Sequence, residues 1–289
     1  MESHESFRAM DTDIDVFIET SAPPPPGSFI GVRLLFEQQE ERFSRFREQS
    51  LLSRLNGGEA IEDAWLARAV TMAIDAHQLT GGYFNPMVLP ALKSAGYDRT
   101  FKEVQGGSVI EPQRVPDPAK VLRVSGLKVE LLAGQLDLGG IVKGWTADLA
   151  AEHLATEHAN AFVNAGGDIR CTGNDATGRG WAMDVSAPDG STAWEGRLAG
   201  AIATSTTMKR RWKAAGGAVA HHLIDPGTGM PSDSPYVQVS ARAGACWIAE
   251  AWAKAVLIGG PDAMERAERA GVPVLAIGRD GERMRSPGW

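Results

Sequence analysis

The sequence predicts an α+β fold, in which helices pack against mixed or antiparallel sheets. Runs with helical spacing of apolar residues and short runs typical of strands follow one another in no regular order. A doubly wound parallel sheet would instead show strict repetition of strand and helix. The chain has 289 residues, enough for one large domain or two intimately packed units, and we expect a single domain over residues 1–289.

Composition argues against several classes of protein. Hydrophobic residues make up 43% and charged residues 22%, which are ordinary globular values, and the net charge of −7 argues against a nucleic-acid binder. No run approaches the ~18 apolar residues of a membrane span, and the first residues lack the pattern of a secretory signal. Cys171 and Cys246 are far apart, which indicates two reduced thiols in a cytoplasmic protein.

The first third of the chain is predicted to contain one strand and two helices. Alternating apolar residues predict a strand at 13–19, and four prolines make the segment 22–28 a loop. Apolar residues at helical spacing from 32 to 46 predict an amphipathic helix. A second helix is expected over 64–79, because two glycines at 81–82 are typical of a helix end.

The remainder is predicted to mix strands and helices. Residues 98–128 are rich in glycine, proline and charge, and should form loops with short strands. The later segments favour a strand–turn–strand at 128–138, a helix at 145–159, strands at 161–167, 181–187, 196–205 and 236–242, a helix at 246–260, and a hairpin at 272–285 that turns at Asp280-Gly281.

The stretch "LDLGGIVKGWTAD" at 136–148 predicts a turn that can hold an anion. Asp137 ends an expected strand, and Gly139-Gly140 would let the backbone approach a ligand closely. The helix that starts near Ile141 would present free N–H groups and a partial positive charge. Lys143 opposes that helix dipole, which makes sense if a phosphate also lies there. The alternative is a tight strand-to-helix connection with a solvated lysine.

Two further turns could carry chemistry. "NAGGDIRCTG" repeats the pattern of a strand, two glycines and an aspartate, Asp168. "HHLIDPGTGMP" places His222 three residues before Asp225, in a rigid bend. A histidine can accept a proton near neutral pH, and an aspartate can orient it. The alternative is a loop histidine beside an Asp-Pro turn.

Taken together, these segments resemble the ApbE family of flavin transferases, the FAD:protein FMN transferases. "FRAMDT" at 7–12 is similar to the family's start, with Asp11 where glycine is usual. "GGYFNPMV" at 81–88 resembles a family turn, with Asn85 for aspartate and Met87 for threonine. The other matching pieces, in family order, are "FSRFREQSLLSRLN" at 43–56, "DLGGIVKGWTAD", "VNAGGDI", "ATS" and "HHLIDPGTGMP".

The resemblance implies an α+β fold related to the tunnelling fold and a bound FAD. In the family, Mg²⁺ held against the diphosphate helps a threonine hydroxyl of an acceptor protein to attack the FMN phosphorus, and AMP leaves. Some relatives let water attack instead, so that FAD is split into FMN and AMP. Such chemistry needs donors or a cation on the phosphates and a base near the incoming hydroxyl.

The resemblance also assigns roles to individual residues. His222 would be the base, with Asp225 beside it, and the Gly140 carbonyl and Glu250 would face the metal. Asp137 and Lys143 would hold polar groups of FAD, and Lys254 would lie near them. The remaining cofactor-binding residues would be Met10, Phe46, Tyr83, Phe84, Asn85, Ile224 and Thr228.

The match departs from the family at "EAWAK", residues 250–254. Glu250 stands where the family has aspartate, and Lys254 stands where it has a metal-binding threonine. In one account the two form an ordinary i,i+4 pair worth ~0.2–0.5 kcal/mol, on a helix shifted away from the metal. In the other, the Lys254 ammonium takes the place of Mg²⁺ and neutralises part of the diphosphate charge.

A second departure is the basic run at 209–213, from which Arg211 or Lys213 could reach a phosphate; a solvated face is the alternative. The first hypothesis is therefore a cytoplasmic FAD:protein FMN transferase that acts on an acceptor protein. The second is a non-catalytic FAD carrier, and the third is an FAD diphosphatase.

Overall fold

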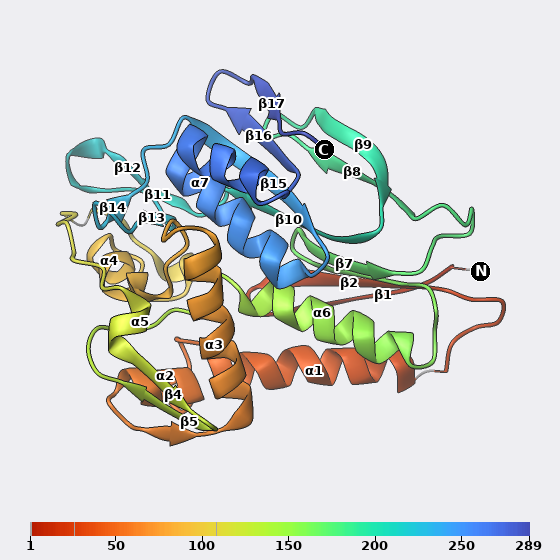
Figure 1. The fold of residues 1–289 in the computed structure, drawn as a ribbon, viewed down its shortest axis with the longest axis horizontal. Helices are drawn as coiled ribbons and strands as arrows, with labels where there is room; N and C mark the ends of the chain where they lie inside the picture. The colour runs from red at the N-terminus through yellow and green to blue at the C-terminus, as the bar shows by residue number, and fades with distance from the viewer. Residues whose placement is uncertain (1, 26, 108) are drawn as a thin grey trace.

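A computed structural model describes residues 2–25, 27–107 and 109–289. Helices pack against antiparallel sheets, which confirms the predicted α+β class (Figure 1). Among these residues the largest sheet has eight strands, and every neighbouring pair is antiparallel. In spatial order the strands are β1 (Glu2–Ala9), β2 (Thr12–Glu19), β6 (Ala161–Ala165), β7 (Asp168–Thr172), β10 (Gly200–Thr206), β15 (Tyr236–Ala243), β16 (Val274–Gly278) and β17 (Arg283–Arg285).

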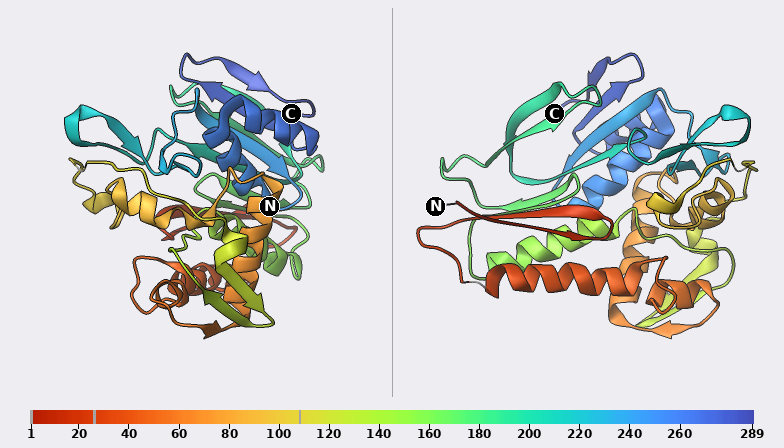
Figure 2. Two further views of the ribbon diagram at one scale, coloured as in Figure 1. Left: turned by 60° about the vertical axis from the view of Figure 1, so that its left-hand side comes forward. Right: turned by 180° about the vertical axis from the view of Figure 1, so that it is seen from behind.

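Three helices cover one face of this sheet, as Figures 1 and 2 show. They are α1 (Gly27–Phe43), α6 (Val142–Ala155) and α7 (Cys246–Arg269). Apolar side chains of β2 and β6 pack against α1 and α6, and each fully buried valine or isoleucine among them contributes about 1.5–3 kcal/mol. The hairpin of β8 (Trp181–Ser186) and β9 (Thr192–Leu198) packs on a separate apolar cluster, which includes Ile202 of β10. Ala201, the residue before it, packs among the helices, as expected for neighbours in a strand.

The remaining elements form two groups. One lies beside α3, and the other consists of short hairpins, of which β13 contacts α7. Figure 2 shows one of these hairpins, β11–β12, projecting from the body of the molecule. The bounds are α2 (Leu51–Asn56), β3 (Ile61–Glu62), α3 (Ala64–Leu79), η1 (Pro86–Val88), α4 (Leu89–Ser94), η2 (Phe101–Glu103), α5 (Pro118–Val121), β4 (Leu122–Ser125), β5 (Lys128–Leu131), β11 (Arg211–Lys213), η3 (Ala215–Gly217), β12 (Val219–His221), β13 (Ile224–Asp225) and β14 (Met230–Pro231).

Strand β1 was missed by the sequence prediction, which covered only β2. Its residues are mostly polar and exposed, and only Phe7 and Ala9 are buried, so hydrophobic alternation gives little signal. The turn between β1 and β2 consists of Met10 and Asp11, which have φ angles of 51° and 56°. Two consecutive left-handed residues are typical of a tight hairpin turn, in which aspartate is tolerated well.

Two other predictions of elements were wrong in part. The strand expected near 135–138 does not form; instead the backbone N–H and C=O of Leu136 bond to the side-chain amide of Asn56, at 2.7 and 2.8 Å. Helix α7 continues past the predicted end, because the chain bends at Gly260 (φ 61°) and resumes a helical path to Arg269. None of the helices among the residues described is long and apolar enough to cross a membrane.

Candidate active site

A cavity of about 410 Å³ lies where the ends of several elements meet, and its size suits a small-molecule site. It is bounded by the β1–β2 turn, the end of α1, the start of α6, the middle of α7 and the segment after β12. Most of the residues that the sequence singled out line it. These are Met10, Phe46, Phe84, Asn85, Asp137, Gly140, Lys143, His222, Ile224 and Lys254.

Four predicted residues lie outside the cavity lining. The Tyr83 ring packs against Gly259, where an added Cβ would lie 2.4 Å from Tyr83 Cδ1. Asp225 Oδ1 accepts a hydrogen bond from Gly227 N at 2.8 Å, and the Thr228 hydroxyl accepts one from Met230 N at 3.3 Å. Both side chains therefore shape their own turn. Glu250 lies beneath the cavity, with its side chain fully buried.

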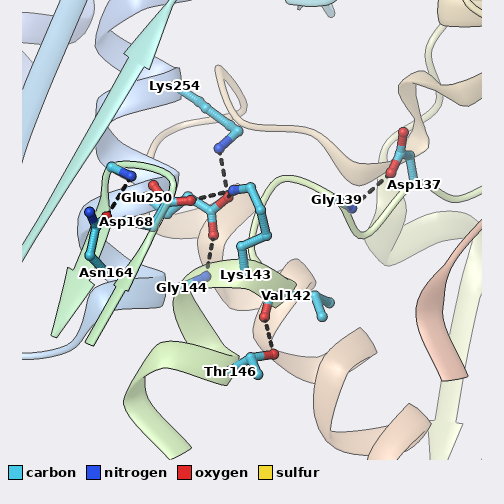
Figure 3. A network of polar contacts seen from close by, with 11 residues as sticks. Asp137, Gly139, Val142, Lys143, Gly144, Thr146, Asn164, Asp168, Glu250 and Lys254 are labelled. Carbon is cyan, nitrogen blue, oxygen red and sulfur yellow. Dashed lines mark hydrogen bonds and ion pairs between the residues drawn. The ribbon is translucent and has the colours of Figure 1, made fainter. Parts of the chain in front are cut away.

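A charged cluster of Lys143, Asp168, Glu250 and Lys254 forms the floor of the site (Figure 3). Glu250 Oε1 accepts hydrogen bonds from Lys143 Nζ at 2.7 Å and from Lys254 Nζ at 2.8 Å. Lys143 Nζ also donates to Asp168 Oδ2. Glu250 Oε2 accepts from the backbone N–H of Gly144 at 2.9 Å. Both oxygens of this buried carboxylate are therefore occupied by donors of the protein.

Mutual attraction keeps Glu250 and Lys143 charged despite burial. Burial alone would raise the pKa of Glu250, but the charges of Lys143 and Lys254 outweigh it and lower that pKa. Burial would likewise lower the pKa of Lys143, but Asp168 and Glu250 together raise it above its ordinary value. The pKa of Asp168 is raised, by burial and then by the neighbouring charge of Glu250. Glu250 and Lys143 are thus ionised at neutral pH.

The glycines of the 136–148 motif make room for protein side chains. An added Cβ at Gly140 would lie 2.7 Å from the Phe84 ring and 3.5 Å from Cδ of Lys254. One at Gly144 would lie 2.9 Å from the backbone carbonyl of Cys246 and from Glu250 Oε2. Gly144 therefore lets α6 and α7 approach closely. Its N–H, in the first turn of α6, meets the Glu250 carboxylate, so the anion at this helix start belongs to the protein.

Asp148 fixes the same two helices at a second point. Its carboxylate accepts hydrogen bonds from the backbone N–H groups of Cys246, at 2.7 Å, and Trp247, at 3.1 Å. A side chain of α6 thus caps the N-terminus of α7, whose N-cap residue, Ala245, has no capping side chain of its own. Burial raises the pKa of Asp148 to about 6.

The residues of the floor do not fit the Mg²⁺ that the resemblance predicts. Magnesium demands oxygen ligands in near-octahedral geometry, but the Glu250 oxygens already accept three hydrogen bonds. Two like unit charges 4 Å apart repel by about 4 kcal/mol at an effective dielectric constant of 20, and a divalent ion beside an ammonium by twice that. Within residues 2–25, 27–107 and 109–289, no group of three or more His, Cys, Asp or Glu side chains could hold a metal ion.

His222 lines the cavity and is uncharged at neutral pH. Its pKa is well below 6.5, because it is buried and because the positive charges of Arg210 and Lys254 disfavour a second cation. Nδ1 of His222 is buried and has no hydrogen-bond partner among the residues that the structure describes. Asp225 is not joined to it. His222 is therefore a neutral imidazole with a nitrogen left unpaired.

Sequence reasoning missed several polar side chains that line the cavity, and three of them, Arg45, Arg210 and Gln39, bear on what it can bind. Arg45 lies over the rings of Phe46 and Tyr97, at 4.3 and 4.5 Å from their centroids, and pairs with Asp137 at 3.3 Å. Arg210 reaches Asp11, at 3.4 Å, from the basic run whose Arg211 is exposed.

The third is Gln39, which is fully buried, and neither atom of its amide has a hydrogen-bond partner in the described part of the chain. The sequence does contain a signal for Gln39, because it is a polar residue at a position within the buried stripe of α1 that includes Val32, Phe36 and Phe43.

The chain is similar to known proteins over most of its length. The model of the ApbE family matches residues 10–276. An FAD:protein FMN transferase of Vibrio cholerae is 28% identical over 257 residues, which are 84% of this chain and 77% of that protein. One of Treponema pallidum is 29% identical over 264 residues, 78% of this chain and 69% of that protein. The solved structure of an ApbE protein from Thermotoga maritima has the same fold, with a TM-score of 0.88 and 24% identity over 99% of this chain and 97% of that one.

Proposed function

Because this chain belongs to the ApbE family, we propose that it is an FAD:protein FMN transferase, which moves FMN from FAD to a threonine hydroxyl of an acceptor protein and releases AMP. The observation that carries the proposal is the cavity itself. Its lining combines the cationic side chains Lys143, Lys254 and Arg210 with aromatic and aliphatic side chains. An anionic diphosphate that joins two flat ring systems matches that combination.

The cationic side chains of the lining suit the diphosphate. Lys254 and Arg210 approach the cavity from two different segments, α7 and the β10–β11 connection. Charge-assisted hydrogen bonds to phosphate are roughly twice as strong as neutral ones. Lys143 donates hydrogen bonds to Asp168 and Glu250, so its role is to position Glu250, which in turn binds Lys254.

The apolar side chains of the lining suit the rings of FAD. Among them are Met10, Phe43, Phe46 and Tyr97, and Arg45 stacks on the rings of Phe46 and Tyr97. Aromatic side chains and a guanidinium plane give a flat heterocycle both buried area and stacking. Ile224 completes the lining beside His222.

The transfer step follows from these positions. The oxygen of the acceptor hydroxyl forms a bond to the phosphorus of the FMN half, and the bond from that phosphorus to the bridging oxygen breaks. AMP leaves with the bridging oxygen, and the hydroxyl proton passes to His222, which is neutral in the free protein. Lys254 and Arg210 bind the charge that develops on the phosphates. Asp225 acts only on the turn that carries Ile224.

The cytoplasm is the proposed compartment. Both cysteines, Cys171 and Cys246, are free and buried, which suits a reducing environment.

The test is an incubation of the purified protein with FAD and a threonine-containing acceptor peptide. AMP is followed by chromatography, and flavin attached to the peptide is followed by its fluorescence. We expect AMP and flavinylated peptide in equal amounts. AMP with only free FMN would identify an FAD diphosphatase, and unchanged FAD on a yellow protein would identify a carrier; either result contradicts the proposal.

A further inference from the structure

Lys254 lies beside Glu250, at the place where the resemblance predicts a metal ion that the surrounding residues do not fit. We propose that the Lys254 ammonium, fixed by Glu250, is the resident cation of this site and binds the diphosphate of FAD without a divalent metal ion. The inference rests on the proposed function, because it takes FAD as the ligand.

The first support is the unequal use of donors by the two lysines. An ammonium has three N–H donors. Lys143 donates two of its hydrogen bonds to protein acceptors, one to Asp168 and one to Glu250. For Lys254, Glu250 is the acceptor recorded among the described residues, and the rest of the ammonium borders the cavity. Its side chain is 15% exposed, so the ammonium is held but remains accessible to a ligand.

The second support is the charge of the floor. When all four groups are ionised, the negative charges of Asp168 and Glu250 are balanced by the positive charges of Lys143 and Lys254. A floor of carboxylates alone would repel a diphosphate unless a metal ion lay between them. Here the ammonium lies between carboxylate and ligand, so a diphosphate meets a cation already in place.

The third support is the packing of the lysine stem. Cδ of Lys254 lies 3.5 Å from the position that a Cβ would take at Gly140. The same helix, α7, holds Glu250 one turn earlier, and the two side chains form an i,i+4 pair of 2.8 Å, of which Lys254 lines the cavity. Helix α7 is therefore not turned away from the site, and Lys254 is built into its wall.

The experiment measures FAD affinity of the purified wild-type protein by quenching of flavin fluorescence, once with EDTA and once with Mg²⁺. We expect the two dissociation constants to agree within about twofold, because the fixed ammonium supplies the cation. Lys254→Met should weaken FAD binding about tenfold or more, whereas Lys254→Arg should retain most of it. Lys120→Met is the matched control, since Lys120 is 81% exposed and lies outside the cavity lining.

Two results would overturn the inference: tighter binding of FAD by tenfold or more with Mg²⁺, or equal affinities of the wild type and Lys254→Met. The wild-type comparison decides even if the methionine variant fails to fold. Transfer is scored separately. FAD binding that needs no metal, without transfer, would contradict the proposed function but support the role of Lys254. Transfer with FAD binding that depends on Mg²⁺ would support the proposed function but contradict the role of Lys254. If the protein does not bind FAD, both proposals are wrong.

A double variant gives a second readout. Lys254→Thr combined with Glu250→Asp removes the ammonium and restores the two oxygen-bearing side chains that the family uses. We expect FAD binding by this variant to become dependent on Mg²⁺. Affinity that stays indifferent to Mg²⁺ and equal to that of the wild type would count against the inference.

Discussion

Glu250 and Lys143 are 107 residues apart in the chain and are joined by a hydrogen bond of 2.7 Å between a fully buried carboxylate and a partly buried ammonium. This contact ties α7 to the first turn of α6 at the floor of the cavity. Because Lys254 shares the same carboxylate oxygen, Glu250 sets the position of both ammonium groups. Its charge is therefore a structural requirement of the site.

Removal of that charge should destabilise the protein. In Glu250→Gln the side chain keeps its shape but leaves two lysines with only Asp168 to balance them. We expect the free energy of unfolding in a denaturant titration to fall by about 3 kcal/mol or more, as for other broken buried pairs. Glu265→Gln is the control, because its pair with Arg269 is 67% exposed on both sides and should change stability by less than about 0.5 kcal/mol. Equal losses in both variants would contradict this account.

Replacement of His222 should separate binding from chemistry. His222→Gln removes the proton acceptor but leaves Lys254 and Arg210 in place. We therefore expect the FAD affinity to stay within a few-fold of the wild-type value and the rate of AMP release to fall by about 10²–10⁴. The same rate measurement on His4→Gln, whose ring stacks on Phe17 outside the cavity lining, should show no change. AMP release that survives in His222→Gln would clear this residue of the role.

The pH dependence of the reaction should differ between free and bound protein. In the free protein the pKa of His222 is well below 6.5, so kcat/KM should stay level as the pH falls from about 8 to about 6. The diphosphate brings negative charge beside His222, which raises its pKa, so kcat should fall over the same range. Steady-state rates of AMP release across this range test both. A single pKa near the ordinary histidine value in both profiles would contradict the environment described.

Gln39 is expected to trade stability for binding. Its amide is buried without a hydrogen-bond partner among the described residues, and such a group costs about 1–3 kcal/mol. We expect Gln39→Leu to raise the free energy of unfolding by about 1 kcal/mol and to weaken FAD binding about tenfold, because the amide matches a ring edge that carries a donor and an acceptor. Gln38→Leu, on the exposed side of the same helix, should do neither. Unchanged affinity in Gln39→Leu would remove Gln39 from the binding site.

Asp148 should make stability depend on pH. Its pKa of about 6 in the folded protein lies above the ordinary value of 3.8, so the folded state binds the proton more tightly than the unfolded state does. The resulting stabilisation is complete below pH ~4 and is lost as the pH rises through 6. Relative to Asp148→Asn, the wild type should lose about 3 kcal/mol between pH ~4 and ~7 in denaturant titrations. A constant difference between the two proteins would show that the carboxyl titrates normally.

The sequence predicted the parts of the site that depend on local signals. The glycine turns, the bend around His222 and the helix of 246–260 are readable because turn residues and helical spacing act over a few positions. The helix boundary at 64–79 was right because Asp63 caps its start and Thr80 closes its end just before two glycines.

What could not be predicted is the partner of each charge. Glu250 meets Gly144 and Lys143 only because α6 and α7 cross closely, and no rule of spacing connects positions so far apart. Gly139-Gly140 were expected to let the backbone approach a ligand closely, but an added Cβ at Gly140 would meet the Phe84 ring first. Gln39 was missed because apolar spacing predicts which positions are buried and says nothing of a polar side chain among them.

The two links between α6 and α7, Asp148 at the start of α7 and Gly144 with Glu250 one turn later, make these helices one rigid body. Any adjustment that lets an acceptor protein in must therefore occur elsewhere on the rim. The Met10–Asp11 turn and the segment around Arg210 line the cavity, are joined by the pair of Asp11 and Arg210, and take no part in the two links between α6 and α7. Partner choice can thus evolve in those loops while the phosphate-binding floor stays unaltered.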